Sequence, residues 1–284
     1  MDAKRLLREG KRALIAARSN VSWTGDEGDV ANDLLEHVLG YHPDPDEEIP
    51  ARTAKRFHAL IARRAEGEPI PHLVGYTEFR GLRLDVKKGA FVPRASTEVM
   101  AGEAAKRLKR RPKPVAVDLA TGIGPVALAI ANEVRKAQVF GVDIGGPAVA
   151  AARANAKKLK LRNVTFSKGD LFEPLPKRLK GAVDVITIHP PYVPKHELKD
   201  LPAELIRYEP VESLTDNSST GTRIVERVAK ESPEWLRPGG WLIVEVDAES
   251  NQLIKRVLKK HGSFADIRSI VGRWNFSRVI FART

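Results

Sequence analysis

The stretch that decides the fold runs from Val183 to Tyr192 and reads Val-Asp-Val-Ile-Thr-Ile-His-Pro-Pro-Tyr. Its first six residues are mostly apolar, which is typical of a strand buried on both faces of a parallel sheet. Two consecutive prolines fix φ and cannot donate hydrogen bonds to a neighbouring strand, so the strand ends here in a stiff loop. Because open α/β sheets bind ligands at the carboxyl ends of their strands, we expect a functional loop at His189–Tyr192.

Apolar runs on either side of this stretch predict further strands. They are Val115–Leu119, Gln138–Asp143, Val164–Phe166, Trp241–Val246 and Val279–Ala282, which together with Val183–Ile188 alternate with helical segments. Alternation of this kind is typical of a mostly parallel sheet with helices on both faces. We therefore expect an α/β domain over residues 94–284.

The first 93 residues follow other patterns. Apolar residues recur at helical spacing along two segments, first at Val30, Leu34, Leu35, Val38 and Leu39 and then at Phe57, Leu60 and Ile61. After the turn at Arg80-Gly81, apolar and charged residues alternate from Leu82 to Val86, as in a hairpin. The sequence thus predicts a helical domain over residues 1–73 and a linking β-hairpin over residues 74–93.

Length and composition narrow the class of protein. With 284 residues, of which 42% are hydrophobic, the chain can form one sizeable core and a small second domain. The absence of cysteine excludes disulfides, thiolate metal ligands and a cysteine nucleophile, and we expect no metal site. No stretch has the roughly 20 apolar residues that span a bilayer, and the first residues lack the apolar run of a signal peptide. We therefore expect a cytoplasmic protein without membrane contact.

The formal net charge of +12 fits a polyanionic partner such as RNA. Lys and Arg gather in several clusters, among them residues 106–111 and 255–260, but apolar residues interrupt each cluster. Such interruption at helical or turn spacing is typical of solvated helix faces. Binding of nucleic acid is therefore the weaker of the two interpretations of this charge.

Residues at the ends of three strand regions form the candidate cofactor site. After the first strand, the segment Asp118-Leu-Ala-Thr-Gly-Ile-Gly124 carries glycines that let the backbone approach a ligand, and Pro125 suits the first turn of a helix. The second strand ends at Asp143, 19 residues after Gly124, where a carboxylate can accept hydrogen bonds from ribose hydroxyls. The third region ends at Asp170, whose carboxylate or neighbouring backbone could recognise an adenine amino group.

Taken alone, the pattern Gly122-x-Gly124-x-x-Ala127 also fits the dinucleotide fingerprint of NAD enzymes. Asp118 argues against NAD, because its carboxylate would crowd a pyrophosphate but can complement the amino group or the sulfonium charge of S-adenosylmethionine. The loop at His189 also argues against it, because it resembles the Asn-Pro-Pro-Tyr or Asp-Pro-Pro-Tyr signature of S-adenosylmethionine-dependent N-methyltransferases. The candidate cofactor-binding residues are Asp118, Ala120, Thr121, Gly122, Ile123, Gly124, Asp143, Ile144, Asp170, Leu171 and His189.

Motifs spread over nearly the whole chain make the resemblance more specific. They are Gly75-Tyr-Thr-Glu-Phe79, Pro93-Arg-Ala-Ser-Thr-Glu98, Tyr208-Glu-Pro210 and Leu236–Trp241. Together with His189–Tyr192 they resemble landmarks of the HemK-type methyltransferases, which modify the glutamine side-chain amide of peptide chain release factors. The resemblance implies a helical domain, a hairpin and a Rossmann-like seven-stranded methyltransferase domain. It also implies S-adenosyl-L-methionine as the methyl donor and a release factor as the partner.

The resemblance further implies roles for the loop after the fourth strand. In the family, an Asn oxygen and a carbonyl of the Pro-Pro segment accept both hydrogens of the acceptor amide, and the aromatic residue lines the pocket. On this chain the catalytic residues would be His189, Pro190 and Tyr192, joined in substrate binding by Pro191 and Arg94. His189 departs from the family pattern, because neutral imidazole has one acceptor nitrogen and imidazolium has none.

Several interpretations of this departure stay open at the level of the sequence. The imidazole could accept one amide hydrogen and leave the other to the Pro190 carbonyl. It could instead be a general base for a small amine, amide or guanidine acceptor, or it could abolish transfer and leave a cofactor-binding protein. A further alternative is methylation of an exocyclic amino group in RNA or DNA, with the base stacked on Tyr192.

Three other departures from the family lie near the expected site. Ala120 stands where the family usually has glycine, and an αR or extended backbone there would tolerate the added methyl group. Leu214–Gly221 replaces a glycine-richer segment, and Asp247-Ala-Glu249 follows a strand where the family often has glycine. On the family's plan the last two lie nearer the acceptor, so we expect donor binding to be kept and the acceptor to have changed.

Overall fold

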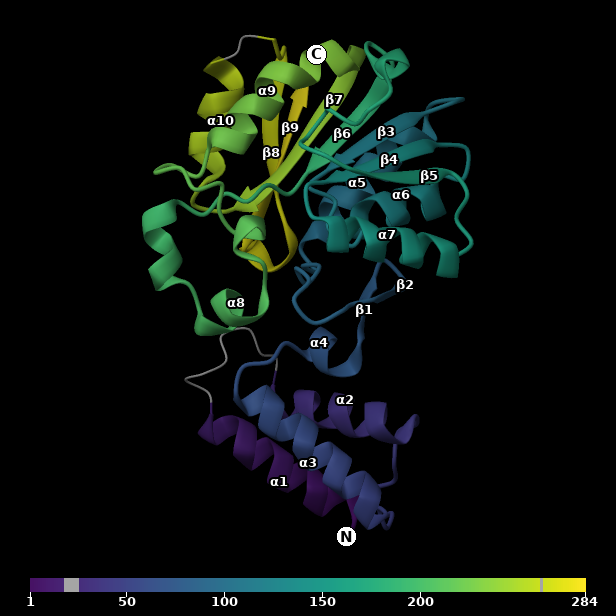
Figure 1. Ribbon diagram of the computed structural model, residues 1–284, viewed down its shortest axis with the longest axis vertical. Coiled ribbons are helices and arrows are strands. Elements are labelled where there is room, and N and C mark those ends of the chain that lie inside the picture. Colours follow the sequence, from purple (N-terminus) through teal and green to yellow (C-terminus); the bar gives the residue numbers. More distant parts are fainter. Residues whose placement is uncertain (18–25, 261–262) are drawn as a thin grey trace. The chain divides into compact units, whose positions relative to one another are not determined.

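The computed structural model describes residues 1–17, 26–260 and 263–284, which group into two compact units (Figure 1). The first unit comprises Met1–Tyr76, Lys87–Gly89 and Asp200–Glu209. The second comprises Thr77–Val86, Ala90–Lys199 and Pro210–Thr284. Within the described ranges, no helix has both the length and the apolar character that crossing a membrane requires.

The first unit is built from helices around an apolar core. Its helices are α1 (Ala3–Ala16), α2 (Glu27–Leu39), α3 (Ala51–Ala65), α4 (Ile70–Val74) and α8 (Ala203–Tyr208). Fully buried side chains such as Leu6, Leu34, Leu35 and Phe57 fill the space between the first three of them. The apolar spacing noted in the sequence therefore marks the inner faces of α2 and α3.

The segment Asp200–Glu209 belongs to the first unit, whereas the sequence analysis included it in the α/β domain. A buried ion pair fastens it there, with Nη1 of Arg64 lying 3.3 Å from Oε1 of Glu204. The Arg64 side chain is 1% exposed, and Nη1 also donates to the carbonyl of Glu68. The local sequence does not predict this ion pair, because its two members are 140 residues apart.

The second unit contains a seven-stranded sheet in the order β5-β4-β3-β6-β7-β9-β8. The strands are β3 (Val115–Leu119), β4 (Gln138–Asp143), β5 (Val164–Lys168), β6 (Val183–Ile188), β7 (Leu236–Asp247), β8 (Asp266–Val271) and β9 (Ser277–Arg283). The five strands from β5 to β7 run parallel, and β9 is antiparallel to both of its neighbours. This confirms the predicted mostly parallel α/β sheet and adds an edge strand, β8, that the apolar runs did not reveal.

Helices cover both faces of this sheet (Figure 1). One core cluster joins the sheet to α5 (Thr97–Lys109), α6 (Pro125–Glu133) and α7 (Gly146–Lys158), and another joins its opposite face to α9 (Arg223–Trp235) and α10 (Asn251–Lys260). A separate two-stranded sheet forms the expected hairpin from β1 (Tyr76–Phe79) and β2 (Leu82–Asp85). Short 3₁₀ turns occupy Lys177–Leu179, Lys195–Asp200, Val211–Ser213 and Arg273–Asn275.

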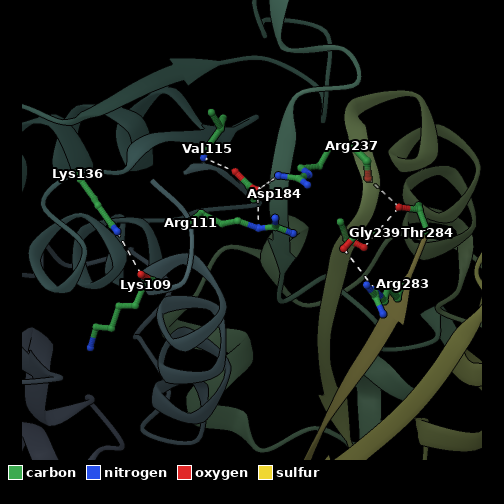
Figure 2. Close-up of polar contacts among 10 residues, drawn as sticks. Lys109, Arg111, Val115, Lys136, Asp184, Arg237, Gly239, Arg283 and Thr284 are labelled. Atoms are coloured by element: carbon green, nitrogen blue, oxygen red, sulfur yellow. Dashed lines mark hydrogen bonds and ion pairs between the residues drawn. The ribbon is translucent and has the colours of Figure 1, made fainter. Parts of the chain in front are cut away.

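A polar cluster around Asp184 joins three strands near their amino ends (Figure 2). Its carboxylate accepts a hydrogen bond from the backbone N–H of Val115, at 2.9 Å. Arg237 and Arg111 place guanidinium nitrogens 3.2 and 3.5 Å from the other oxygen. Asp184 is thus a buried charge with partners, and it stabilises the end of the sheet away from the predicted ligand site.

Candidate active site

The loop that follows β6 forms one wall of the candidate active site. The rings of His189 and Tyr192 stack with their centroids 5.8 Å apart and their planes within 7° of each other. Phe91 meets the His189 ring edge-on, at 6.0 Å between centroids. Oγ1 of Thr97 lies 3.2 Å from Nδ1 of His189. Aromatic packing and one hydrogen bond therefore hold the imidazole in a fixed orientation.

Charged groups from strand β7 and from the loop before α5 surround this imidazole. Oε2 of Glu245, on β7, lies 3.7 Å from Nδ1 of His189, and the Glu245 side chain is 1% exposed. Burial lowers the pKa of His189 below its ordinary value of 6.5, and Arg94 acts in the same direction. Glu245 and Asp247 oppose that effect without reversing it. Near pH 7 His189 is thus a neutral imidazole with one acceptor nitrogen.

The segment Leu214–Gly221, which departs from the family pattern, packs against the backbone of the loop around Tyr192. Val193 and Lys195 donate backbone hydrogen bonds to the carbonyls of Leu214 and Ser218. Gly221 has φ +65°, and a Cβ there would lie 1.9 Å from the carbonyl oxygen of Tyr192. Burial also raises the pKa of Tyr192 well above its ordinary value, so its hydroxyl stays protonated. The 214–221 segment therefore shapes the predicted acceptor loop directly.

The remaining predicted substrate-binding residues lie on or beside the same loop. Pro190 is buried, Pro191 is half-buried, and both follow β6 directly. The guanidinium carbon of Arg94 lies 4.5 Å from the centroid of the Phe91 ring, the same ring that contacts His189. The loop and the entrance to α5 thus share one cluster of side chains.

The predicted cofactor loop leaves the sheet beside the His189 loop. In the register of β3 and β6, Leu119 pairs with Ile188, so the residues after each are neighbours. Asp118 is 2% exposed, and its carboxylate accepts hydrogen bonds from the hydroxyls of Thr121, at 2.5 Å, and Thr187, at 2.7 Å. Burial raises the pKa of Asp118 to about 6, and the two hydroxyls limit the rise. The ionised form is therefore costly in the folded protein.

The backbone of this loop is unusual at Ala120. Its φ is +51°, which is the left-handed region and not the αR or extended conformation in which the methyl group would be tolerated. Gly122 and Gly124 also have positive φ, and α6 begins directly after Gly124 with Pro125 in its first turn. The loop turns too tightly for a standard conformation at residue 120, so the alanine carries strain that glycine would avoid.

The carboxylate at the end of β4 is bound to the same loop. Asp143 accepts hydrogen bonds from the N–H groups of Gly122, at 2.7 Å, and Gly145, at 2.8 Å. Burial raises its pKa, while both N–H groups act in the opposite direction. The adjacent Ile144 is 61% exposed, and a Cβ at Gly122 would meet no heavy atom within 4 Å. An apolar side chain and open backbone therefore flank the carboxylate.

The third predicted strand end has a different environment. Both oxygens of Asp170 lie within 3.1 Å of Nη1 of Arg227, which projects from α9. Leu171 has φ +49°, and its side chain is buried in the core. Any contact of Leu171 with a ligand would thus involve its backbone. Sequence reasoning missed Arg227 as the partner of Asp170, because a lone arginine on a helix carries no signal.

Two other residues of the site were not among the predicted site residues. Thr97 appeared in the sequence only as part of a motif, and Glu245 only as a charge at the end of an apolar strand. Glu245 could have been found from the sequence, because a carboxylate within a strand that is buried on both faces is costly and indicates a partner or a function. Its partner could not be read from the sequence.

Comparisons with known proteins define the class of protein first. Residues 112–272 match the family model described as a methyltransferase domain, and residues 5–75 match the PrmC N-terminal domain. The donor set fits S-adenosylmethionine, because carboxylates that can accept from its amino and hydroxyl groups end β3 and β4 beside an open glycine backbone. The chain is an S-adenosylmethionine-dependent N-methyltransferase.

Curated relatives then identify the family. A release factor glutamine methyltransferase from Rhodopirellula baltica is 35% identical over 251 residues, which cover 87% of this chain and 82% of that protein. Proteins of the same description from Geobacter sulfurreducens and Yersinia pestis are 34% and 37% identical, covering 86% and 76% of this chain and 84% and 75% of theirs. The chain belongs to the release factor glutamine methyltransferase family, which confirms the resemblance drawn from its motifs.

Proposed function

We propose that this protein methylates the glutamine side-chain amide of a peptide chain release factor. The observation that carries the proposal is the rigid His-Pro-Pro-Tyr loop at the end of β6, beside the glycine loop of β3. Similarity to release factor glutamine methyltransferases supports the same acceptor. An acceptor that acts in translation implies that the protein works in the cytoplasm.

The site residues would act mainly by positioning. When bound, S-adenosylmethionine supplies a methyl group on a sulfonium sulfur, which a nitrogen lone pair attacks in line with the breaking bond. Nε2 of neutral His189 would accept one amide hydrogen, and the carbonyl of Pro190 would accept the other. Both contacts draw the nitrogen away from amide planarity and expose its lone pair. Tyr192, stacked on His189, would form the apolar wall that excludes water.

The donor would lie over the glycine loop. Asp143 would accept hydrogen bonds from the ribose hydroxyls, with Ile144 alongside the adenine. Asp118, ionised above about pH 6, would supply negative charge opposite the cationic end of the donor. Asp170, or the backbone beside it, would contact the adenine amino group. Arg94 and Pro191 would contact the acceptor.

The experiment is methyl transfer from labelled S-adenosylmethionine to purified release factor. A release factor whose acceptor glutamine is replaced by alanine is the control. Label that depends on the glutamine supports the proposal. Absence of label, in a preparation that binds the donor by calorimetry, would overturn it.

A second candidate acceptor is a small amine or guanidine. The observation that favours it is the neutral imidazole beside a buried carboxylate, a pair suited to removing a proton from a basic nitrogen. Incubation of the enzyme with a small-molecule cell extract and labelled donor tests this candidate. Labelled products in the extract, with none on the release factor, would favour it.

A further inference from the structure

Glu245 is a buried carboxylate that the proposed positioning of the acceptor does not use. It lies in β7, is 1% exposed, and neither of its oxygens accepts a hydrogen bond within the described part of the chain. A carboxylate in such a place is costly unless a positive charge or a donor compensates it. The group that can compensate it is the imidazole of His189, whose Nδ1 lies 3.7 Å from Oε2 of Glu245.

The other groups around the imidazole are already engaged. Asp247, two residues along the same strand, accepts from the N–H and the hydroxyl of Ser250. Arg94 packs over Phe91, and Tyr192 presents its ring face rather than a charge. Thr97 faces Nδ1 with a hydroxyl that can either donate or accept. Glu245 is therefore the carboxylate with lone pairs to offer to the ring.

This arrangement favours the tautomer of His189 that carries its proton on Nδ1. Thr97 and Glu245 both lie on the Nδ1 side, so a proton on Nδ1 faces two acceptor oxygens. The lone pair then lies on Nε2, at the opposite edge of the ring. A second-layer carboxylate that fixes a histidine tautomer is a recurring device in acid–base sites.

We propose that Glu245 is a positioning residue that keeps the proton of His189 on Nδ1 and lets Nε2 receive the proton that the acceptor nitrogen loses. The nature of that acceptor rests on the proposed function. As the N–CH₃ bond forms, the S–CH₃ bond breaks and its electron pair passes to sulfur. One N–H bond of the acceptor breaks, and its proton binds Nε2. The resulting imidazolium is stabilised by Glu245 until it releases the proton to water.

The direct test is the tautomer of His189 in the full-length protein, without any acceptor. The chain has seven histidines, so ¹⁵N-imidazole spectra of the wild type and of His189→Asn identify the signal of residue 189. We expect an Nδ1–H tautomer above pH 7 in the wild type. In Glu245→Gln we expect a mixture of tautomers and a lower titration midpoint for His189, because a negative charge beside the imidazolium is lost.

Asp247→Asn is the matched control, because it removes a carboxylate from the same strand that is bound to Ser250. It should keep the Nδ1–H tautomer. An Nε2–H tautomer in the wild type would overturn the proposal, and so would a Glu245→Gln spectrum identical to that of the wild type. Neither result depends on the release factor as acceptor, so failure of the proposed function is seen separately.

Turnover provides the second measurement. With the acceptor identified, Glu245→Gln should lower kcat at least tenfold, leave the donor affinity unchanged and shift the acid limb of the pH profile to lower pH. In a His189→Asn background, Glu245→Gln should have no further effect. Equal losses in both backgrounds would show that Glu245 acts only on the structure, which contradicts the proposal.

Discussion

Asp118 offers the sharpest test of how the donor site is built. Its carboxyl is fully buried, and its pKa rises from 3.8 to about 6. This makes the ionised form cost about 3 kcal/mol in the folded protein, since each pH unit corresponds to about 1.4 kcal/mol. Asp118→Asn keeps the shape and removes the charge. At pH 7.5 we expect the variant to be more stable than the wild type by up to about 3 kcal/mol.

The pH dependence follows from the direction of this pKa change. The unfolded chain ionises Asp118 near pH 3.8, whereas the folded protein keeps the proton until about pH 6. Unfolding therefore releases a proton between these values, and the wild type loses stability as the pH rises through that window. The advantage of Asp118→Asn should thus shrink to about half at pH 5.0. The same variant should bind S-adenosylmethionine at least tenfold more weakly, because negative charge opposite a cation is lost.

Urea unfolding followed by tryptophan fluorescence at both pH values measures the stability, and calorimetry measures the donor affinity. Asp184→Asn is the matched control, because it neutralises a buried carboxylate that has two arginine partners. That variant should lose about 1–3 kcal/mol of stability. The reasoning is refuted if Asp118→Asn is less stable than the wild type at pH 7.5, or if its advantage is the same at both pH values.

Three further predictions concern backbone strain, the acceptor loop and the first unit. Ala120→Gly should raise the free energy of unfolding by about 1 kcal/mol, because φ is +51° there. A lower free energy of unfolding in a urea titration would contradict the left-handed backbone. Gly221→Ala should reduce methyl transfer at least tenfold with donor affinity retained, because its Cβ would collide with the Tyr192 carbonyl, and full activity would argue against that contact. Glu204→Gln should destabilise the first unit by about 3–5 kcal/mol, because Arg64 stays buried without its counter-charge. Proteolysis within residues 200–209 should then be faster, and an unchanged cleavage rate would contradict this prediction.

The sequence predicted six of the seven strands of the sheet and missed β8. Val115–Leu119 and Val183–Ile188 were predicted with the bounds that the structure has, because an uninterrupted apolar run has few alternatives. β8 was missed because it lies at the edge of the sheet, where Ile270 and Val271 are exposed and polar residues interrupt the pattern. Apolar runs thus located every strand of the sheet except this one edge strand.

The candidate site divides in the same way between local and long-range information. Asp118, Asp143 and His189 could be predicted because each lies at the carboxyl end of a recognisable strand. The partners that set their chemistry could not, since Thr187 reaches Asp118 across 69 positions and Glu245 reaches His189 from another strand. The left-handed backbone at Ala120 could not be predicted, because the tightness of its turn depends on how the loop closes onto Asp143 and α6. Motif reading identified the residue types but not the contacts between them.

The membership of Asp200–Glu209 in the first unit has a consequence for anyone who wishes to separate or exchange parts of this enzyme. A fragment that stops at residue 76 would lack α8 and would leave the guanidinium of Arg64 without its counter-charge, Glu204. Grafting the helical unit of a relative onto this catalytic unit would likewise require three pieces of chain rather than one. The first unit can therefore not be moved as one continuous stretch, because the chain leaves the second unit after Lys199 and re-enters it at Pro210.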